Sequence, residues 1–189
     1  KANRDETNTK YAQGGIAAVT YAPDSVEKHI ADTLDAGDGL CDERIVRMVT
    51  TEGMDRIREL IHWGADFDKD ESGKFDLARE GGHSEHRILH HKDSTGAEIE
   101  RTLLDQIIHH PNIELHTHFF ALDLITQHHL GEEVTRSSGG IACYGAYVLN
   151  LTTNKVDTIL SRITMIATGG AGQLYRTTTN PRIATGDGV

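Results

Sequence analysis

The periodicity of the sequence changes at Pro111-Asn112, and this change limits the folds that the chain can adopt. Before it, apolar residues recur at the spacing of amphipathic helices; after it, they alternate or run together as they do in strands. Capping residues and glycines mark where each helix should begin and end. We expect helices that begin at Ser25, at Asp42 and near Ser94 or Thr95, and that end at Gly37, Gly64 and Pro111-Asn112.

The second half of the chain predicts an antiparallel β-meander. Ile113–Thr126, Ile141–Leu151 and Val156–Leu160 have strand character, and Thr153-Asn154 suits the tight turn between the last two. Ile163–Ala167 then has the pattern of a short buried strand. Helices, an inserted meander and a buried strand together predict the α/β class.

A long polar segment separates the second expected helix from the third. Asp66–Asp93 contains glycines and several of the 12 histidines of the chain, and it shows no sustained periodicity. A loop of this length in a compact domain is often functional. We therefore expect residues of a functional site within it.

Composition excludes several classes of protein. With 189 residues, 37% of them hydrophobic, the chain is long enough to bury a core. Its formal net charge of -10, without a basic stripe, argues against nucleic acid or an anionic membrane as a partner. No apolar run reaches the length of a membrane span, and the polar start does not resemble a signal peptide. Cys41 and Cys143 form no Cys-x-x-Cys unit, which predicts a reducing, cytoplasmic location.

A glycine pair near the start of the chain is the first motif that suggests a ligand. In Tyr11–Val19 the pair Gly14-Gly15 opens onto small and apolar residues, so the backbone can approach a flat molecule closely. Gly-Gly alone is usually only a turn. The whole string Asn8–Gly15, however, resembles the flavin-contacting loop of the succinate dehydrogenase, fumarate reductase and L-aspartate oxidase flavoproteins.

Two glycine motifs near the other end of the sequence carry the same resemblance. Ile166–Ala171 is similar to the Ala-Thr-Gly signature of FAD-dependent oxidoreductases, and Asn180–Gly188 contains the Gly-Asp-Gly element of this family. A carboxylate such as Asp187 can accept hydrogen bonds from a ribitol or ribose hydroxyl. Each motif seen alone is as often a simple turn, and we interpret the similar Gly37-Asp38-Gly39 only as a helix stop.

The motif that distinguishes members of the family lies in the long polar segment. Arg79–Ser84, followed by Arg87–His90, resembles the Arg-Glu-Gly-Gly-His-Ser stretch of the L-aspartate oxidases, where succinate dehydrogenases have Phe-Gly-Gly. Because aspartate has an amino group and succinate has none, Glu80 would hydrogen-bond the substrate ammonium and orient it. The alternative is a solvated loop glutamate that pairs with Arg79 or Arg87.

Asn8 adds a second distinction within the family. The respiratory members carry a flavin-linking histidine five positions before the glutamine of the loop, and counting back from Gln13 gives Asn8. An asparagine cannot form that bond. The resemblance therefore implies FAD that is bound noncovalently.

The resemblance implies an enzyme that oxidises L-aspartate to iminoaspartate by hydride transfer to FAD, with oxygen or fumarate as electron acceptor, in quinolinate and NAD biosynthesis. It names quinolinate synthase as a candidate partner and leaves direct binding open. Glu80 would orient the substrate. The cofactor would be held by Lys1, Asn8, Thr9, Lys10, Tyr11, Ala12, Gln13, Gly14, Gly15, Thr168, Gly169 and Asp187.

The resemblance also implies a domain organisation. Residues 1–189 would be part of a two-dinucleotide-binding-fold FAD domain that lacks the N-terminal βαβ unit and the cap domain. A helical and loop part would cover 1–112, the meander about 113–162, and the return strand with its FAD-contacting turn 163–189. No Gly-x-Gly-x-x-Gly occurs in the sequence. We therefore expect this stretch alone to be inactive and to bind FAD weakly or not at all.

Two other functions stay open at this point. One is a soluble fumarate reductase or succinate dehydrogenase flavoprotein, against which Glu80 and Asn8 argue. The other is a noncatalytic metal-binding module, since His116 and His118 would lie on one side of a strand. We favour an exposed polar face and assign no metal site. Three further histidines flank the candidate substrate loop and are expected to orient it by hydrogen bonds: His83, His86 and His90.

Overall fold

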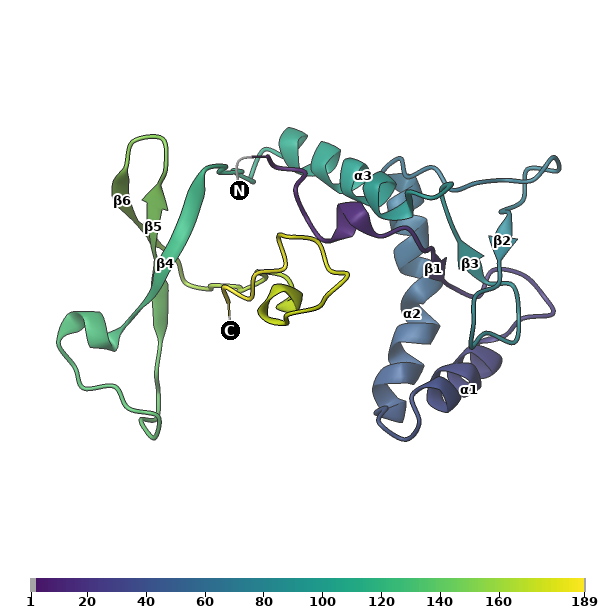
Figure 1. Cartoon of the computed structure of the whole chain (residues 1–189), viewed down its shortest axis with the longest axis horizontal. Coiled ribbons are helices and arrows are strands. Elements are labelled where there is room, and N and C mark those ends of the chain that lie inside the picture. The colour runs from purple at the N-terminus through teal and green to yellow at the C-terminus, as the bar shows by residue number, and fades with distance from the viewer. Residues whose placement is uncertain (1–2, 189) are drawn as a thin grey trace. The chain divides into compact units, whose positions relative to one another are not determined.

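The computed structural model describes residues 3–188, which divide into two compact units (Figure 1). The first, here called the helical unit, is Thr7–Ile113. The second, the meander unit, comprises residues 3–6 and 114–188. None of the helices within residues 3–188 is long and apolar enough to cross a membrane.

The helical unit contains the three expected helices, and the first two have the expected side-chain caps, whereas the Ser94 side chain forms no capping hydrogen bond at the third. They are α1 (Val26–Ala36), α2 (Glu43–His62) and α3 (Thr95–His109), preceded by the short 3-10 helix η1 (Thr9–Tyr11). Ser25 Oγ accepts a hydrogen bond from the Lys28 backbone N–H, and the Asp42 side chain accepts one from the Arg44 N–H, so each cap satisfies one free N–H at the start of α1 or α2. Asp38 and Gly39 have positive φ values of 46° and 81°, which confirms that Gly37–Gly39 stops a helix.

A small antiparallel sheet in the helical unit lies partly in the segment predicted as a loop. Its order is β1 (Ile16–Ala17), β3 (Ile88–Leu89) and β2 (Leu77–Ala78). The prediction of an unbroken loop was wrong here because two-residue strands are too short to show alternation. β3 is buried, and Leu89 belongs to the core with Ala18, Ile57, Ala65 and Phe67.

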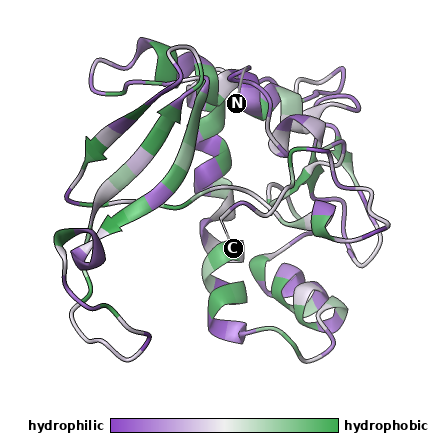
Figure 2. Cartoon of the chain, turned by 60° about the vertical axis from the view of Figure 1, so that its left-hand side comes forward, coloured by the Kyte–Doolittle hydropathy of each residue, from purple (hydrophilic) through white to green (hydrophobic). Residues whose placement is uncertain are grey.

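The meander unit confirms the predicted antiparallel meander. β4 (Phe119–Thr126), β5 (Cys143–Asn150) and β6 (Lys155–Leu160) pair in chain order, and hydrophobic residues occur along all of them (Figure 2). The tight turn before β6 includes Asn154 with φ 53°. Short 3-10 helices follow β4 (η2, Gln127–Leu130) and lead toward the C-terminus (η3, Gly172–Leu174).

Two strand predictions in the meander unit were wrong. The first strand begins at Phe119, because His118 has φ 61° and breaks the extended run; His116 and His118 therefore do not share a strand face. Ile163–Ala167 forms no strand, and Ile163 and Met165 are 86% and 85% exposed. A buried strand needs neighbouring strands, and nothing within residues 3–188 pairs with this one.

Candidate cofactor and substrate site

The Gly-Gly loop of the helical unit is held at both ends by close backbone contacts. At one end, the Gly96 N–H at the start of α3 donates to Ala12 O at 2.9 Å, and a Cβ on Gly96 would lie 1.8 Å from Thr9 O. At the other end, a Cβ on Gly15 would lie 2.2 Å from Leu89 O of β3. Only glycine fits at either contact, so the loop is clamped between α3 and the small sheet.

The middle of this loop offers polar groups to a ligand. Tyr11–Gly14 are exposed, and the backbone N–H groups of Gln13 and Gly14 find no acceptor within the described part of the chain. Asn8 Oδ1 is buried without a hydrogen-bond partner among residues 3–188. A buried unsatisfied acceptor is costly and needs an explanation. A flavin ring carries carbonyl oxygens, ring nitrogens and an N–H, and so offers partners both for the free donors of Gln13 and Gly14 and for the free acceptor of Asn8.

The structure places Glu80 beside this loop. A Cβ built on Gly14 would lie 3.4 Å from Glu80 Oε1, so the carboxylate is in contact range of the Gly-Gly backbone. Glu80 is exposed, and none of the ion pairs found within residues 3–188 includes it. The alternative pairing with Arg79 or Arg87 is therefore not formed, and the carboxylate is available to a ligand.

Glu80 begins a tight turn through two glycines. The His83 N–H donates to Glu80 O at 3.3 Å, and Gly82 has φ 83°, a conformation that favours glycine. Beyond the turn, the Ser84 N–H and Oγ–H both donate to Asp32 Oδ2 at 2.8 Å. The motif that carries Glu80 is thus attached to α1 at its far end.

A buried arginine completes this attachment. The Arg87 side chain is 0% exposed; it donates two hydrogen bonds to Asp24, at 2.8 and 2.9 Å, and one to Asp32 Oδ2 at 2.5 Å. Burial raises the pKa of Asp32, but the hydrogen bonds from Ser84 and Arg87 outweigh it and hold that pKa at about 2. Asp32 is therefore charged throughout the neutral range.

Two histidines adjoin this network. His83 Nδ1 lies 3.2 Å from Arg87 Nη1, and the His83 and His29 rings are 5.8 Å apart. Burial lowers the pKa of His29, with further lowering from the charges of Arg87 and His83 and partial opposition from Asp24 and Asp32. His90 Nδ1 donates to Asp68 Oδ2 at 2.9 Å, so His83 and His90 both form hydrogen bonds that orient the loop, as expected. No hydrogen bond of the His86 side chain is found within residues 3–188, so its orienting role stays a prediction.

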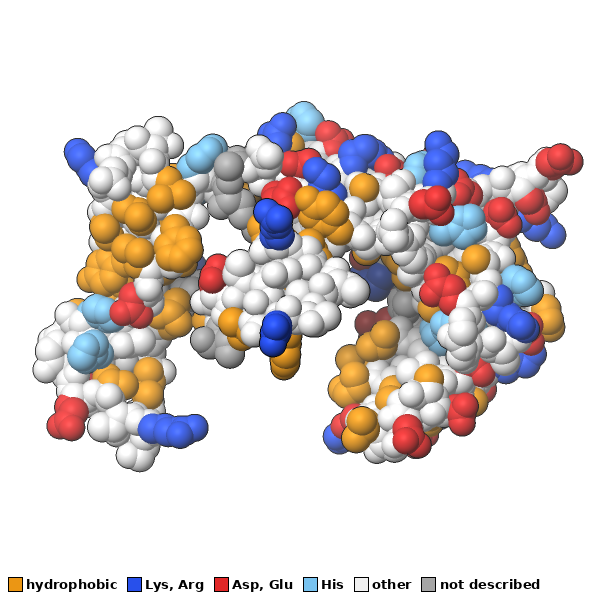
Figure 3. Space-filling view, viewed as in Figure 1, with side chains coloured by type: hydrophobic (Ala, Val, Ile, Leu, Met, Phe, Trp, Pro, Cys, Tyr) orange, Lys and Arg blue, Asp and Glu red, His pale blue; other side chains and the backbone are white. Residues whose placement is uncertain are grey.

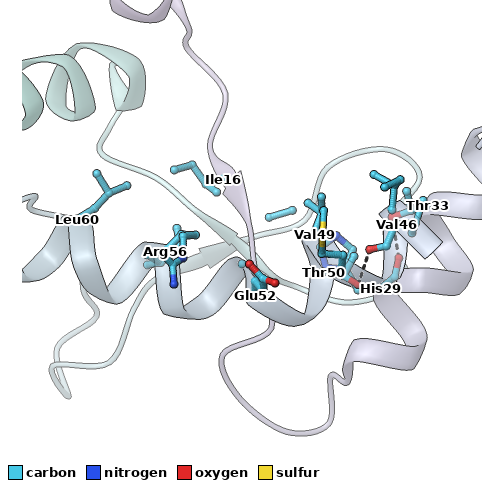
Figure 4. A pocket seen from close by; sticks show the side chains of 14 residues that line it. Ile16, His29, Thr33, Val46, Val49, Thr50, Glu52, Arg56 and Leu60 are labelled. Atoms are coloured by element: carbon cyan, nitrogen blue, oxygen red, sulfur yellow. Dashed lines mark hydrogen bonds between the residues drawn. The ribbon is translucent and has the colours of Figure 1, made fainter. Parts of the chain in front are cut away.

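His29 also lines a mostly apolar pocket of about 610 Å³ between α1, α2 and β1 (Figure 4). Its walls include Ile16 from β1 and Val49 and Leu60 from α2. None of the residues predicted to bind cofactor or substrate lines this pocket.

In the meander unit the two glycine motifs near the C-terminus come together. The Gly186 N–H donates to Gly170 O at 3.1 Å, and a Cβ on Gly188 would lie 1.9 Å from Thr168 Oγ1. Thr185 Oγ1 donates to Asp187 Oδ2 at 2.7 Å and orients that carboxylate. The Thr-Gly-Gly and Gly-Asp-Gly turns are therefore in direct contact.

A cavity of about 530 Å³ lies against these turns, within the size range of small-molecule sites. Thr168 and Asp187 both line it, so two of the predicted cofactor residues share one cavity. Phe119 and Arg182 contribute an aromatic and a cationic side chain, which the sequence analysis did not single out. Arg182 lies within the Asn180–Gly188 motif and Phe119 within the predicted meander, but nothing in either pattern marks these side chains as cavity residues; only their placement in the fold does.

The remaining predicted residues are distributed as follows. Thr9 and Tyr11 lie in η1, and the Lys10 N–H donates to Thr7 Oγ1 at 3.2 Å. Lys1 lies outside the described residues.

No group of three or more His, Cys, Asp or Glu side chains within residues 3–188 is arranged to hold a metal ion. The two cysteines, Cys41 and Cys143, are free thiols.

A clamped Gly-Gly loop and a pair of contacting glycine turns are features of a domain that holds a nucleotide-type cofactor. The family model described as FAD binding domain matches residues 1–189, and the chain belongs to this family. Its cofactor is FAD, and the free donors at Gln13 and Gly14 and the unpartnered Asn8 Oδ1 fit that group.

Relatives named as L-aspartate oxidases match the whole chain. L-aspartate oxidase 2-a, chloroplastic, of Nicotiana tabacum is 51% identical over 189 residues, which cover 100% of this chain and 28% of the relative. L-aspartate oxidase of Vibrio cholerae is 42% identical over 194 residues and is covered to 35%. The chain thus spans about a third or less of these relatives.

Solved structures of respiratory flavoproteins share the fold. The quinol fumarate reductase of E. coli superposes with a TM-score of 0.86 at 30% identity, over 97% of this chain and 29% of that chain. The Sdh1 complex of Mycobacterium smegmatis with UQ1 gives 0.85 at 28% identity, over 100% and 32%. The α/β content with antiparallel sheets is therefore that of the FAD-binding domain in this fold.

Proposed function

We propose that this chain forms part of an FAD-dependent L-aspartate oxidase, which converts L-aspartate to iminoaspartate. One observation carries the proposal: the Glu80 carboxylate lies beside Gly14 of the Gly-Gly loop and has no cationic partner within residues 3–188. The high identity to relatives named L-aspartate oxidase supports it.

Glu80 is the group that would recognise the substrate. Its carboxylate accepts hydrogen bonds from the ammonium of L-aspartate and turns the α-carbon toward the cofactor side of the Gly-Gly loop. Charge-assisted hydrogen bonds of this kind are about twice as strong as neutral ones. A dicarboxylate without an amino group would leave Glu80 without this partner.

The chain's own residues would hold FAD in two places. In the helical unit, the Gln13 and Gly14 N–H groups and Asn8 Oδ1 bind the polar edge of the flavin, with Thr9–Ala12 and Gly15 shaping the loop. In the meander unit, Thr168 and Asp187, which line one cavity, bind hydroxyl groups of the cofactor, and Gly169, with φ 82°, shapes the turn beside them. When bound, FAD would supply the acceptor for the hydride, which carries the two electrons that leave the substrate.

Several finer features belong to the same proposal. FAD is held noncovalently, because Asn8 stands where a linking histidine would be. The domain is a two-dinucleotide-binding fold, oxygen or fumarate takes the electrons, and the product enters quinolinate and NAD biosynthesis, with quinolinate synthase as a candidate partner. The two free thiols favour a reducing compartment such as the cytoplasm, although relatives in plants are named chloroplastic.

The first test is a substrate comparison with the whole protein that contains this chain. L-aspartate should be oxidised, with release of ammonia as the imine hydrolyses, and succinate should not be oxidised at a comparable rate. Comparable or faster oxidation of succinate would move the chain to the respiratory flavoproteins. That second candidate is favoured by the TM-score of 0.86 to quinol fumarate reductase.

A further inference from the structure

The position of Glu80 depends on backbone geometry and not on its own side-chain contacts. The residue is exposed and belongs to none of the ion pairs of residues 3–188. Its main chain, however, starts the turn that the His83 N–H closes at 3.3 Å. Whatever fixes the end of that turn therefore fixes the carboxylate relative to Gly14.

The end of the turn is fixed by one carboxylate oxygen on α1. Asp32 Oδ2 accepts hydrogen bonds from the Ser84 N–H and Oγ–H, both at 2.8 Å, and from Arg87 Nη1 at 2.5 Å. A single oxygen thus holds the segment on the C-terminal side of the turn. The Asp32 side chain is only 16% exposed, and its bond from the buried Arg87 guanidinium is shielded from water, whereas Ser84 itself is exposed.

Arg87 holds this oxygen in place, because the arginine is itself fixed by a buried ion pair. Its guanidinium is fully buried and forms a bidentate pair with Asp24, whose side chain is only 4% exposed. Bidentate pairs fix orientation as well as distance. Asp24 lies just before α1 and Asp32 lies within it, so both carboxylate partners of Arg87 belong to the α1 region.

We propose that Asp32 is a positioning residue for substrate recognition: through Ser84 and the turn at 80–83 it sets the place of the Glu80 carboxylate beside Gly14. This inference rests on the proposed role of Glu80. Asp32 does not touch the substrate, and its effect on catalysis passes through Glu80 alone.

A double-mutant cycle in the whole protein with FAD bound tests this route. Asp32→Asn should lower kcat/KM for L-aspartate about tenfold, chiefly through a higher KM, and hydrogen exchange should rise in residues 79–86. In the Glu80→Gln background the same change should cost less than twofold, because the carboxylate that it positions is gone. Asp35→Asn, an exposed carboxylate on the same helix, is the control and should keep wild-type kinetics.

The outcomes separate this inference from the proposed function. Equal losses in both backgrounds, or no loss from Asp32→Asn, would overturn the positioning role while the role of Glu80 stands. Unchanged aspartate kinetics in Glu80→Gln would overturn both. If Asp32→Asn does not fold, the same cycle is run with Ser84→Ala, which removes the hydrogen bond from the Ser84 hydroxyl. The conservative variant Ser84→Thr keeps a hydroxyl and should show the wild-type KM.

Discussion

At the scale of single residues, Arg87 shows how the substrate motif depends on partners far away in the sequence. The motif offers Arg87 as a candidate partner for Glu80, but the arginine turns inward to Asp24 and Asp32. Those carboxylates are 63 and 55 positions away, and no spacing rule connects them to it. The motif was predictable from the sequence; the network that supports it was not.

Removing the buried guanidinium should destabilise the protein strongly. Arg87→Met leaves Asp24 buried without its partner, which should cost roughly 3–5 kcal/mol of unfolding free energy. Arg58→Met, which breaks an exposed pair with Asp55, is the matched control and should cost no more than about 0.5 kcal/mol. Denaturant titration of the whole protein measures both, and similar losses for the two variants would contradict the account.

The lowered pKa of His29 predicts a pH dependence of stability. The unfolded chain binds a proton near the ordinary value of 6.5, whereas the folded state holds His29 neutral to lower pH. Stability should therefore fall as pH drops below 6.5, because protonation favours the unfolded state. His29→Gln should flatten the decline in the unfolding midpoint between pH 7 and pH 5. An unchanged slope would show that His29 is not the group responsible.

At the scale of elements, the sequence predicted those helices and strands that depend on short-range sequence patterns. Ser25 and Asp42 cap their helices as their positions indicated, and the meander follows its strand pattern. The strand predicted for Ile163–Ala167 does not form, because a strand also needs neighbouring strands to pair with, and the local sequence pattern does not show whether they are present. Ile163, Met165 and Ile166 of that segment are exposed, and hydrophobic side chains gather over the meander strands in Figure 3.

The contact between α3 and the Gly-Gly loop should not tolerate a side chain at Gly96. In Gly96→Ala the new Cβ would lie 1.8 Å from Thr9 O, so α3 must move away from the loop. We expect a loss of about 1–3 kcal/mol of stability and weaker FAD binding. Flavin fluorescence titration and the unfolding midpoint measure the two effects.

Gly53→Ala is the control for this contact. It also lies in a helix, but its Cβ would meet nothing within 4 Å. Alanine should therefore stabilise α2 by about 0.5–1 kcal/mol and leave FAD binding unchanged. Equal effects of the two substitutions on FAD affinity would show that the Gly96 contact does not shape the cofactor loop.

At the scale of the whole molecule, the residues that we propose to bind FAD occur in both units. The Gly-Gly loop and Glu80 belong to the helical unit, and Thr168, Gly169 and Asp187 belong to the meander unit. The family could be predicted from the sequence because its motifs are short and local. The cavity at Asp187, with Phe119 and Arg182, could not, since its walls come from distant segments.

The mode of FAD attachment is a property of the whole protein. Because Asn8 cannot link to the flavin ring, acid precipitation of the FAD-loaded protein should leave all of the yellow colour in the supernatant. Asn8→Ala should weaken FAD binding about five- to tenfold, as expected for one lost hydrogen bond. Flavin that stays with the precipitate would disprove noncovalent binding.

The most direct test of the central claim compares Glu80→Gln with wild type, both loaded with FAD, in the oxidation of L-aspartate by the whole protein. Glu71→Gln, an exposed glutamate elsewhere in Asp66–Asp93, is the control and should match wild type. Glu80→Gln should lower kcat/KM for L-aspartate at least tenfold, since the amide lacks the charge that holds the ammonium. Wild-type kinetics in Glu80→Gln would contradict the account and make Glu80 a solvated loop residue.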